Sequence, residues 1–261
     1  MAETEWTLTY TGTALSMGLI PSNIWLTTPP VIGPAELTNE DGQRARQDGA
    51  SFGADFRGGR AIDFEIGVNG PSETEALDRA AVLTKAWRGD SIRKTAGELA
   101  TLTIKQPGRT RVVFGRPRRL APVGTSFQHQ GYLSYIGDFA CTDDVFYSST
   151  LTSTTGGAFT VAGDLPAWPI VVVNGPSTNP VVNFGAFSLA LNYTIPSGKS
   201  VTINTVPWVR SVKTSDGLSI PGKLVRTTRL SRASLAPGGH TVSLTGGGTL
   251  NVSWRTSYSS L

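Results

Sequence analysis

Length and composition exclude a short peptide and a disulfide scaffold, because the chain has 261 residues and a single cysteine, Cys141. The sequence opens without the charged and then apolar segment of a secretory signal, so we expect a protein that stays in a reducing cytoplasm. Its purely aliphatic runs, such as residues 170–173, are far shorter than the roughly 20 residues of a membrane helix, so we expect no membrane insertion.

The composition favours strands over helices. The 30 glycines, the 16 prolines and the many threonines are poor in helix interiors, and threonine is common in strands. Only 16% of the residues are charged, less than the quarter or so that is usual, which predicts a surface that is uncharged or covered by neighbours. After residue 150 the only acids are Asp164 and Asp216, so the second half is mildly basic. We expect a mainly β protein.

The first strands are predicted from alternation. Residues 6–13 form a candidate strand, whereas the polar residues 36–51 are typical of a loop. Residues 60–68 alternate strictly between apolar and other side chains, which predicts a strand with one buried face. Its inward members are Ile62, Phe64, Ile66 and Val68, and its outward members include Asp63 and Glu65.

Residues 72–89 carry the signals of a helix. Ser72 and Glu75 have the spacing of a capping box, and Gly89 is typical of a helix end. Side chains at helical steps predict one face of this helix, which comprises Leu77, Ala80, Ala81, Thr84 and either Trp87 or Arg88.

A hairpin and a strand pair follow the helix. The hairpin covers residues 99–115 and turns at Pro107 and Gly108, and the strand pair covers residues 131–147. The first part of the chain is therefore predicted to be β-rich with one helix.

Residues 148–158 are polar and of low complexity, and we place a domain boundary there. This predicts an N-terminal domain at 1–150 and a C-terminal domain at 151–261. In the second domain, short β-type runs are separated by turn signals without a helical pattern, which predicts a β-sandwich. The runs are residues 168–173, 187–193, 200–203, 206–212, 240–244 and 249–254.

The sequence offers little for catalysis. Its two histidines, His129 and His240, and its one cysteine are too few for a zinc site, and the nucleophile elbow of a serine hydrolase is missing. Asp143 and Asp144 are adjacent, so in a strand they would point to opposite faces instead of forming the carboxylate pair of a glycoside hydrolase. We expect no enzymatic activity, no metal and no cofactor.

Two groups of side chains are candidates for binding. A basic cluster is either a nucleic-acid contact, a solvated hairpin or a subunit contact to an acidic partner; its members are Arg109, Arg111, Arg116, Arg118 and Arg119. Trp168 and Trp208 are either core residues or platforms on which a sugar stacks.

Motifs along the chain resemble the distal tail proteins, often called minor tail proteins, of long-tailed (siphophage-type) bacteriophages. The first motif is Gly58-Gly59-Arg60, which leads into the alternating strand and then the capped helix. Residues 138–148, 174–182 and 235–242 follow in the order and spacing of that family. The resemblance covers nearly the whole chain.

The resemblance implies an N-terminal domain of split-barrel or sandwich type, six copies of which form a ring, followed by a galectin-like C-terminal sandwich. It also implies a structural baseplate hub at the virion tail tip, assembled in the host cytoplasm. Its partners would be the tail tube protein and the tape-measure, tail-hub and receptor-binding proteins, with DNA only as cargo through the lumen. We expect assembly-interface residues at Arg57, Arg60, Arg116 and Arg118.

Two other classes of function compete with a hub. A carbohydrate-binding module that recognises the host cell surface would use Trp168 and Trp208. A galectin-type sugar site needs a glutamate, however, and the chain has none after Glu98. A wall-degrading hydrolase is disfavoured by the scarcity of histidines and acids.

Overall fold

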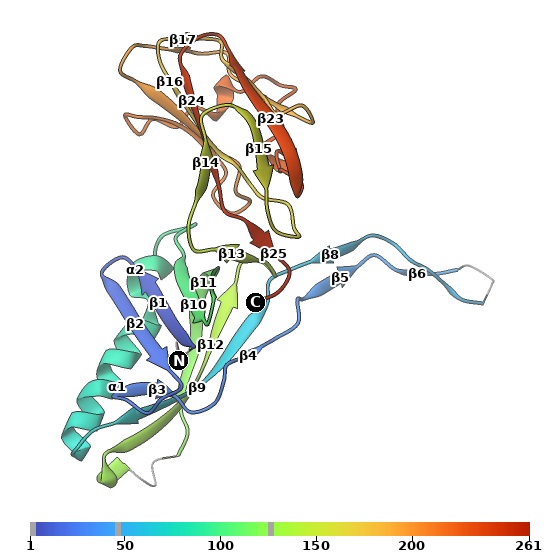
Figure 1. The fold of residues 1–261 in the computed structure, drawn as a ribbon. Coiled ribbons are helices and arrows are strands. Elements are labelled where there is room, and N and C mark those ends of the chain that lie inside the picture. Colours follow the sequence, from blue (N-terminus) through green and yellow to red (C-terminus); the bar gives the residue numbers. More distant parts are fainter. Residues whose placement is uncertain (1–3, 45–47, 125–127) are drawn as a thin grey trace. The chain divides into compact units, whose positions relative to one another are not determined.

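The computed structural model describes residues 4–44, 48–124 and 128–261. Contacts divide the chain into two compact units, Met1–Asp144 and Val145–Leu261, and each unit is built mainly from antiparallel strands (Figure 1). The expected mainly β class is confirmed. The division between the units precedes the boundary that the polar residues 148–158 had indicated.

A curved sheet forms the body of the first unit, in the strand order β2-β1-β10-β11-β12-β9-β3, with β4 also paired to β9. Its strands are β1 Glu5–Tyr10, β2 Thr13–Gly18, β3 Ile24–Leu26, β4 Val31–Ile32, β9 Ala61–Asn69, β10 Ala100–Gln106, β11 Arg109–Pro122 and β12 Tyr132–Cys141. The predicted strand at 60–68 and the predicted hairpin are confirmed as β9 and as the β10–β11 pair.

Two of the strand predictions differ from the structure, one in its extent and one in its pairing. The candidate strand at 6–13 is divided by a turn, where Gly12 has φ +74°. The predicted strand pair at 131–147 does not exist, because β12 pairs with β11 and β9. Its expected partner, β13 Phe146–Ser148, belongs to the second unit and pairs there with β25 Ser257–Tyr258.

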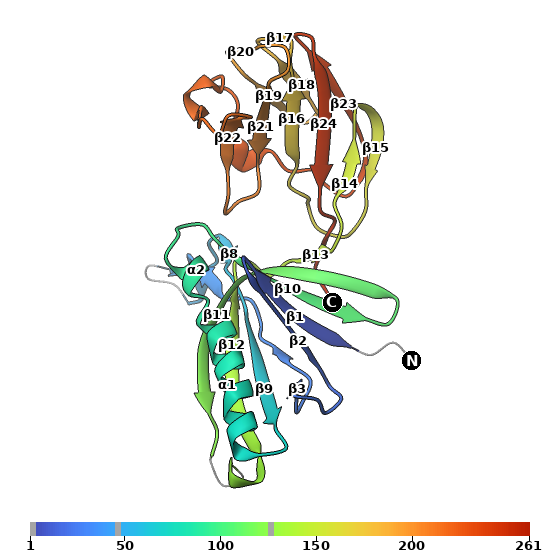
Figure 2. The ribbon, with the colours of Figure 1, turned by 90° about the vertical axis from the view of Figure 1, so that its left-hand side faces the viewer.

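The alternation along β9 gives the sheet a buried face and an exposed face. Ile62, Phe64, Ile66 and Val68 are buried, whereas Asp63 and Glu65 are exposed. Helix α1 Glu73–Arg88 lies along the buried face (Figure 2). The rings of Phe64 and Trp87 meet edge to face with centroids 5.5 Å apart. The short helices α2 Asp90–Arg93 and η1 Gln128–Gln130 complete the unit.

The ends of α1 follow the predicted signals. The Glu75 amide donates to Ser72 Oγ at 3.3 Å, and Gly89 takes the left-handed conformation at φ +57°.

The predicted face of α1 matches the buried face only in part. The buried residues are Ala76, Ala80, Leu83, Ala86 and Trp87, and Leu77 is exposed. The small side chains of Ala76, Ala80 and Ala86 are buried, and a Cβ added at Gly70, in the loop that precedes the helix, would collide with the backbone of Ala76. Ala80 and Trp87 belong to both the predicted and the observed face, whereas Leu77, Ala81 and Thr84 are exposed.

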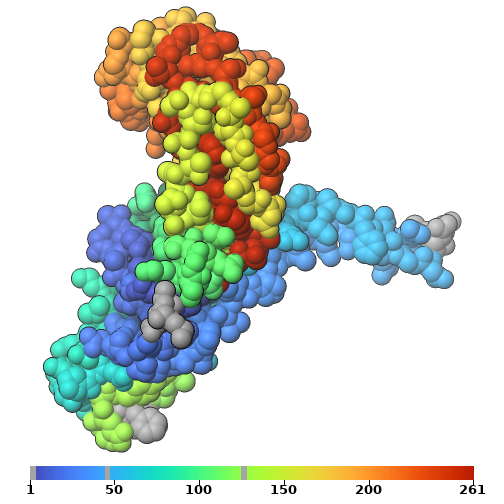
Figure 3. Space-filling view, in the orientation of Figure 1, coloured from blue at the N-terminus to red at the C-terminus, as the bar shows by residue number. Residues whose placement is uncertain are grey.

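The predicted loop at 36–51 is also wrong, because its described residues include β-strands, while residues 45–47 lie outside the described residues. The strands at 37–43 and 50–57 form a two-stranded ribbon, which projects from the sheet of the first unit in light blue (Figures 1 and 3). The ribbon contains β5 Leu37–Asn39 paired with β8 Asp55–Arg57, and β6 Gly42–Gln43 paired with β7 Ala50–Ser51. All of these strand residues are exposed, so the sequence contains no apolar alternation that could reveal the strands.

The second unit is a sandwich of two sheets around one core. The sheets have the orders β14-β24-β16-β21-β22 and β15-β23-β18-β19, and β17 pairs with β20. The strands are β14 Thr152–Thr154, β15 Gly157–Val161, β16 Ile170–Asn174, β17 Ser177–Thr178, β18 Val181–Asn183, β19 Ser188–Ala190, β20 Thr194–Ile195, β21 Ser200–Asn204, β22 Ser211–Thr214, β23 Gly238–Thr245 and β24 Thr249–Trp254, with short helices η2 Pro221–Lys223 and η3 Leu230–Arg232.

Both sheets contribute side chains to this core. Val171 of β16 and Trp254 of β24 come from one sheet, and Val182 of β18 and Val242 of β23 come from the other. The predicted sandwich is therefore confirmed. Of the predicted strands, the one at 249–254 is matched by β24, whereas residues 206–210 form no strand.

Candidate functional site

The motif Gly58-Gly59-Arg60 lies at the root of the ribbon, between β8 and β9. The Gly58 amide donates to the Glu36 carbonyl at 2.7 Å, and the Glu36 amide donates to the Gly59 carbonyl at 3.0 Å. A Cβ at Gly59 would collide with the carbonyl oxygen of Cys141, so this close approach requires glycine. The motif therefore fixes the place at which the ribbon leaves the sheet.

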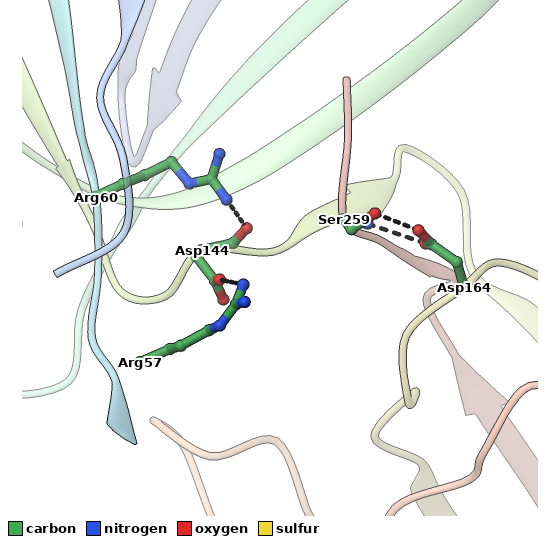
Figure 4. A network of polar contacts seen from close by, with 5 residues as sticks. All are labelled: Arg57, Arg60, Asp144, Asp164 and Ser259. Atoms are coloured by element: carbon green, nitrogen blue, oxygen red, sulfur yellow. Dashed lines mark hydrogen bonds and ion pairs between the residues drawn. The ribbon is translucent and has the colours of Figure 1, made fainter. Parts of the chain in front are cut away.

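Two arginines at this root bind the same aspartate (Figure 4). The Arg60 guanidinium donates to the main-chain carbonyl of Asp144, and Arg57 Nη1 lies 3.1 Å from the Asp144 carboxylate. The Arg57 side chain is 71% exposed, whereas that of Asp144 is 15% exposed. Arg60 is thus a positioning residue at the junction, and Arg57 remains open to solvent on its other side.

Cys141 lies beside this junction and is buried. Its amide donates to the Arg60 carbonyl at 2.8 Å. Burial raises the pKa of the Cys141 thiol to about 12, with a further upward contribution from Asp143 that Arg60 opposes. The thiol is therefore neutral and packs as a small apolar group.

The ribbon carries large apolar side chains on its surface. Phe52 is 85% exposed, Leu37 is 66% exposed and Phe56 is 57% exposed. The sequence analysis did not select these residues, because they fall in or beside the segment predicted to be a loop. The one signal that could have found them is the pair of aromatic residues, Phe52 and Phe56, in an otherwise polar stretch. A two-stranded ribbon is marginally stable alone in water, so these side chains are suited to contact with another protein.

The basic cluster does not form one surface. Arg116 is half-buried, and its guanidinium donates to the carbonyls of Glu98 at 2.6 and 2.8 Å and of Thr95 at 2.9 Å. Arg118 and Arg119 are exposed and line two different cavities. Of the arginines predicted at an interface, Arg116 holds the unit together internally, whereas Arg118 is free to meet a partner.

Trp168 and Trp208 of the second unit are half-buried and already have neighbours. The Arg210 guanidinium lies 5.8 Å from the ring centroid of Trp168. The ring of Tyr147 meets that of Trp208 edge to face, with centroids 5.8 Å apart. These contacts favour a structural role for both tryptophans over a sugar platform.

The described ranges offer no cluster of three or more metal-ligating side chains. His240 belongs to β23, where its Nε2 lies 2.7 Å from the Ala236 carbonyl oxygen and its ring stacks on Phe159. Within residues 4–44, 48–124 and 128–261, no helix is both long and apolar enough to span a bilayer.

Comparison with known proteins identifies the fold. No model of a protein family matches the chain, and neither does any curated protein. Among solved structures, the Dit (gp 19.1) protein of phage SPP1, described as a paradigm of the hub adsorption apparatus of phages that infect Gram-positive bacteria, superposes with a TM-score of 0.62 at 16% identity. That match covers 97% of this chain and 98% of the SPP1 chain.

Chains of the phage P2 baseplate in its activated conformation superpose equally well. The form with calcium gives a TM-score of 0.64 at 10% identity and covers 99% of both chains. The form with strontium gives 0.61 at 10% identity and covers 97% of this chain and 98% of that one. The chain therefore has, over nearly its whole length, the fold of phage Dit hub and baseplate proteins, as its resemblance to distal tail proteins implied.

Proposed function

We propose that this chain is a structural, non-enzymatic hub of a phage tail tip. In this hub, the first units of several copies of the chain, most simply six, form a ring. The carrying observation is the fold, which agrees with the SPP1 hub protein along 97% of this chain and 98% of the other. A similarity confined to the sandwich would have left the first unit unexplained, whereas this one includes both units.

The projecting ribbon gives a physical reason for self-assembly. A ring closes when one surface of each copy contacts a different surface of the next copy through a repeated rotation. Leu37, Phe52 and Phe56 present apolar area to solvent on an element with little support of its own. We propose that a neighbouring copy covers them.

The second unit then serves as an attachment module for other proteins of the tail tip, including receptor-binding proteins, while the ring adjoins the tail tube, tape-measure and tail-hub proteins. The whole protein is then located in the virion tail, after assembly in the host cytoplasm. DNA passes through the lumen of the ring as cargo. The alternative of a carbohydrate-binding module is disfavoured, because Trp168 and Trp208 are engaged by Arg210 and Tyr147.

Sedimentation velocity and negative-stain microscopy of the purified chain test this proposal. We expect rings whose population rises with concentration. Replacing residues 38–56 by a short Gly-Ser linker should abolish the rings, and Phe52→Ser with Phe56→Ser should raise the concentration needed for assembly at least about tenfold, as loss of buried aromatic anchors does.

The matched control is Leu218→Ser, because Leu218 is 62% exposed but belongs to the second unit. It should leave ring formation unchanged. A wild-type chain that stays monomeric at all concentrations and fails to bind tail proteins would contradict the hub. Rings that persist without the ribbon would contradict only the role of the ribbon.

A further inference from the structure

The exposed face of the first unit's sheet carries an acidic groove. Asp63 and Glu65 project from β9, and Asp138 of the adjacent β12 stands directly opposite Asp63 in the register. These three carboxylates line a cavity of about 290 Å³, in which Arg119 is the sole cation among its lining residues. We call the surface formed by Asp63, Glu65 and Asp138 the acidic groove.

The carboxylates of the groove are incompletely neutralised within the unit. The Arg119 amide donates to Asp138, and Thr28 Oγ1 donates to Glu65 at 3.2 Å. The carboxylate of Asp63 has no hydrogen-bond or ion-pair partner among the described residues. Like charges directly opposite each other on paired strands destabilise a sheet, so a cationic partner would relieve a repulsion that the isolated unit retains.

The helix-covered side of the same unit has the opposite charge. Arg88, Arg93 and Arg118 line a cavity of about 270 Å³, in which Asp90 is the one carboxylate. Arg93 Nη2 is fixed by the carbonyls of Pro117 at 2.6 Å and Arg118 at 3.1 Å. We call the surface formed by Arg88, Arg93 and Arg118 the basic pocket.

Most of the positive charge in the basic pocket is available to a partner. Arg88 lies 3.1 Å from Asp90, but the two side chains are 68% and 57% exposed, so this pair is weak. The Arg118 guanidinium has no partner among the residues that the structure describes. The register of β11 and β12 shifts between Pro117 and Leu120, and this irregularity sends Arg118 and Arg119 to different cavities.

We propose that the acidic groove of one copy binds the basic pocket of the next copy and sets the register of the ring. This inference rests on the proposed function. A head-to-tail ring needs two different, complementary surfaces on each copy. Here three carboxylates with one guanidinium are matched by three guanidiniums with one carboxylate, on opposite sides of one sheet. Such complementarity selects the partner and its orientation.

Charge reversal in pairs tests the contact. One variant carries Asp63→Lys and Glu65→Lys, and the other carries Arg88→Glu and Arg118→Glu; all four positions are exposed, so the fold should be retained. Each variant alone should assemble at least about tenfold less readily than the wild type, since like charges then meet at the contact. The effect should shrink as salt is added.

Mixing the two variants in equal amounts supplies the decisive outcome. The reversed groove of one variant then meets the reversed pocket of the other, so an alternating ring with an even number of copies should form again. The chain with all four substitutions should also assemble alone. Lys213→Glu with Lys223→Glu, two exposed reversals in the second unit, is the matched control and should leave assembly unchanged.

The outcomes separate this inference from the proposed function. Variants that assemble like the wild type, or that fail to recover on mixing, overturn the contact while the ring stands. A wild-type chain that never forms rings fails the proposed function itself. If a reversed variant does not give the wild-type circular dichroism spectrum, Asp63→Asn with Glu65→Gln keeps the test intact: neutralising the groove should weaken assembly by a smaller factor, and an unchanged assembly would overturn the contact.

Discussion

The two units differ in how their acidic side chains are paired. In the second unit, both acids are engaged internally: Asp164 accepts hydrogen bonds from the amide and hydroxyl of Ser259 (Figure 4), and Asp216 lies 2.7 Å from Lys199 Nζ. In the first unit, the side chains of Asp63 and Arg118 have no partner within the described ranges. The first unit therefore retains an unpaired carboxylate on its surface, whereas the two acids of the second unit are paired within it.

The first unit also differs from the second in the exposed apolar side chains of its ribbon. The ribbon of the first unit exposes Leu37, Phe52 and Phe56, and it lies outside any core. The second unit closes two sheets over a core that includes Trp254 at 1% exposure. Each unit has its own core, and the apolar side chains of the ribbon are the surface that we propose a neighbouring copy covers.

The largest expected effect tests whether the two cores are independent. Trp87→Ala removes a buried ring that packs on Phe64 at 5.5 Å and against Gly137, so it should cost about 3–5 kcal/mol of unfolding free energy. In urea unfolding, the transition of the first unit should move and that of the second should not. Leu77→Ala, at an exposed site on the same helix, should change little. A parallel shift of both transitions would show that the units unfold together.

An intermediate effect is expected from the buried thiol of Cys141. In the folded chain the pKa of the Cys141 thiol is about 12, whereas the pKa of an unperturbed thiol is 9.0. Between these values the unfolded state binds fewer protons, so stability falls as pH rises, by up to about 1.4 kcal/mol per pH unit. The Cys141→Ala variant lacks this thiol, so its free energy of unfolding should fall less than that of the wild type between pH 9 and pH 12. Equal pH profiles would contradict the burial of the thiol.

The smallest effect concerns the acids of the second unit. Asp164→Ala removes two hydrogen bonds that hold Ser259, next to β25, and should cost about 1 kcal/mol because the carboxylate is exposed. Hydrogen exchange at the Ser259 amide should accelerate. Asp216→Ala breaks only an exposed ion pair with Lys199 and should cost at most about 0.5 kcal/mol. Equal losses for the two variants would show that Ser259 is held by other contacts.

Strands with one buried face were predictable, because burial leaves an alternation in the sequence. The pattern of Ile62, Phe64, Ile66 and Val68 located β9, and the capping signals at Ser72 and Gly89 located α1. The ribbon was not predictable in this way. Its strands have no buried face, so their polar sequence looked like a loop.

The roles of the candidate interface residues were also not predictable from the sequence. The sequence placed Arg116 and Arg118 in one basic cluster, yet Arg116 binds the carbonyls of Glu98 and Thr95 while Arg118 faces an open cavity. The two have the same charge and lie two positions apart. Their different roles depend on a loop and a register shift that only the folded chain contains.

The sequence by itself determined the mainly β class, the helix with its two ends, the sandwich of the second half and the scarcity of catalytic side chains, because these depend on local pattern and composition. The tertiary structure decided which face of α1 is buried, that residues 37–43 and 50–57 form a ribbon, and that Asp63 and Asp138 share a groove opposite the pocket of Arg118. Those features depend on which distant segments meet, and pairing between strands far apart in the chain leaves no local pattern in either of them.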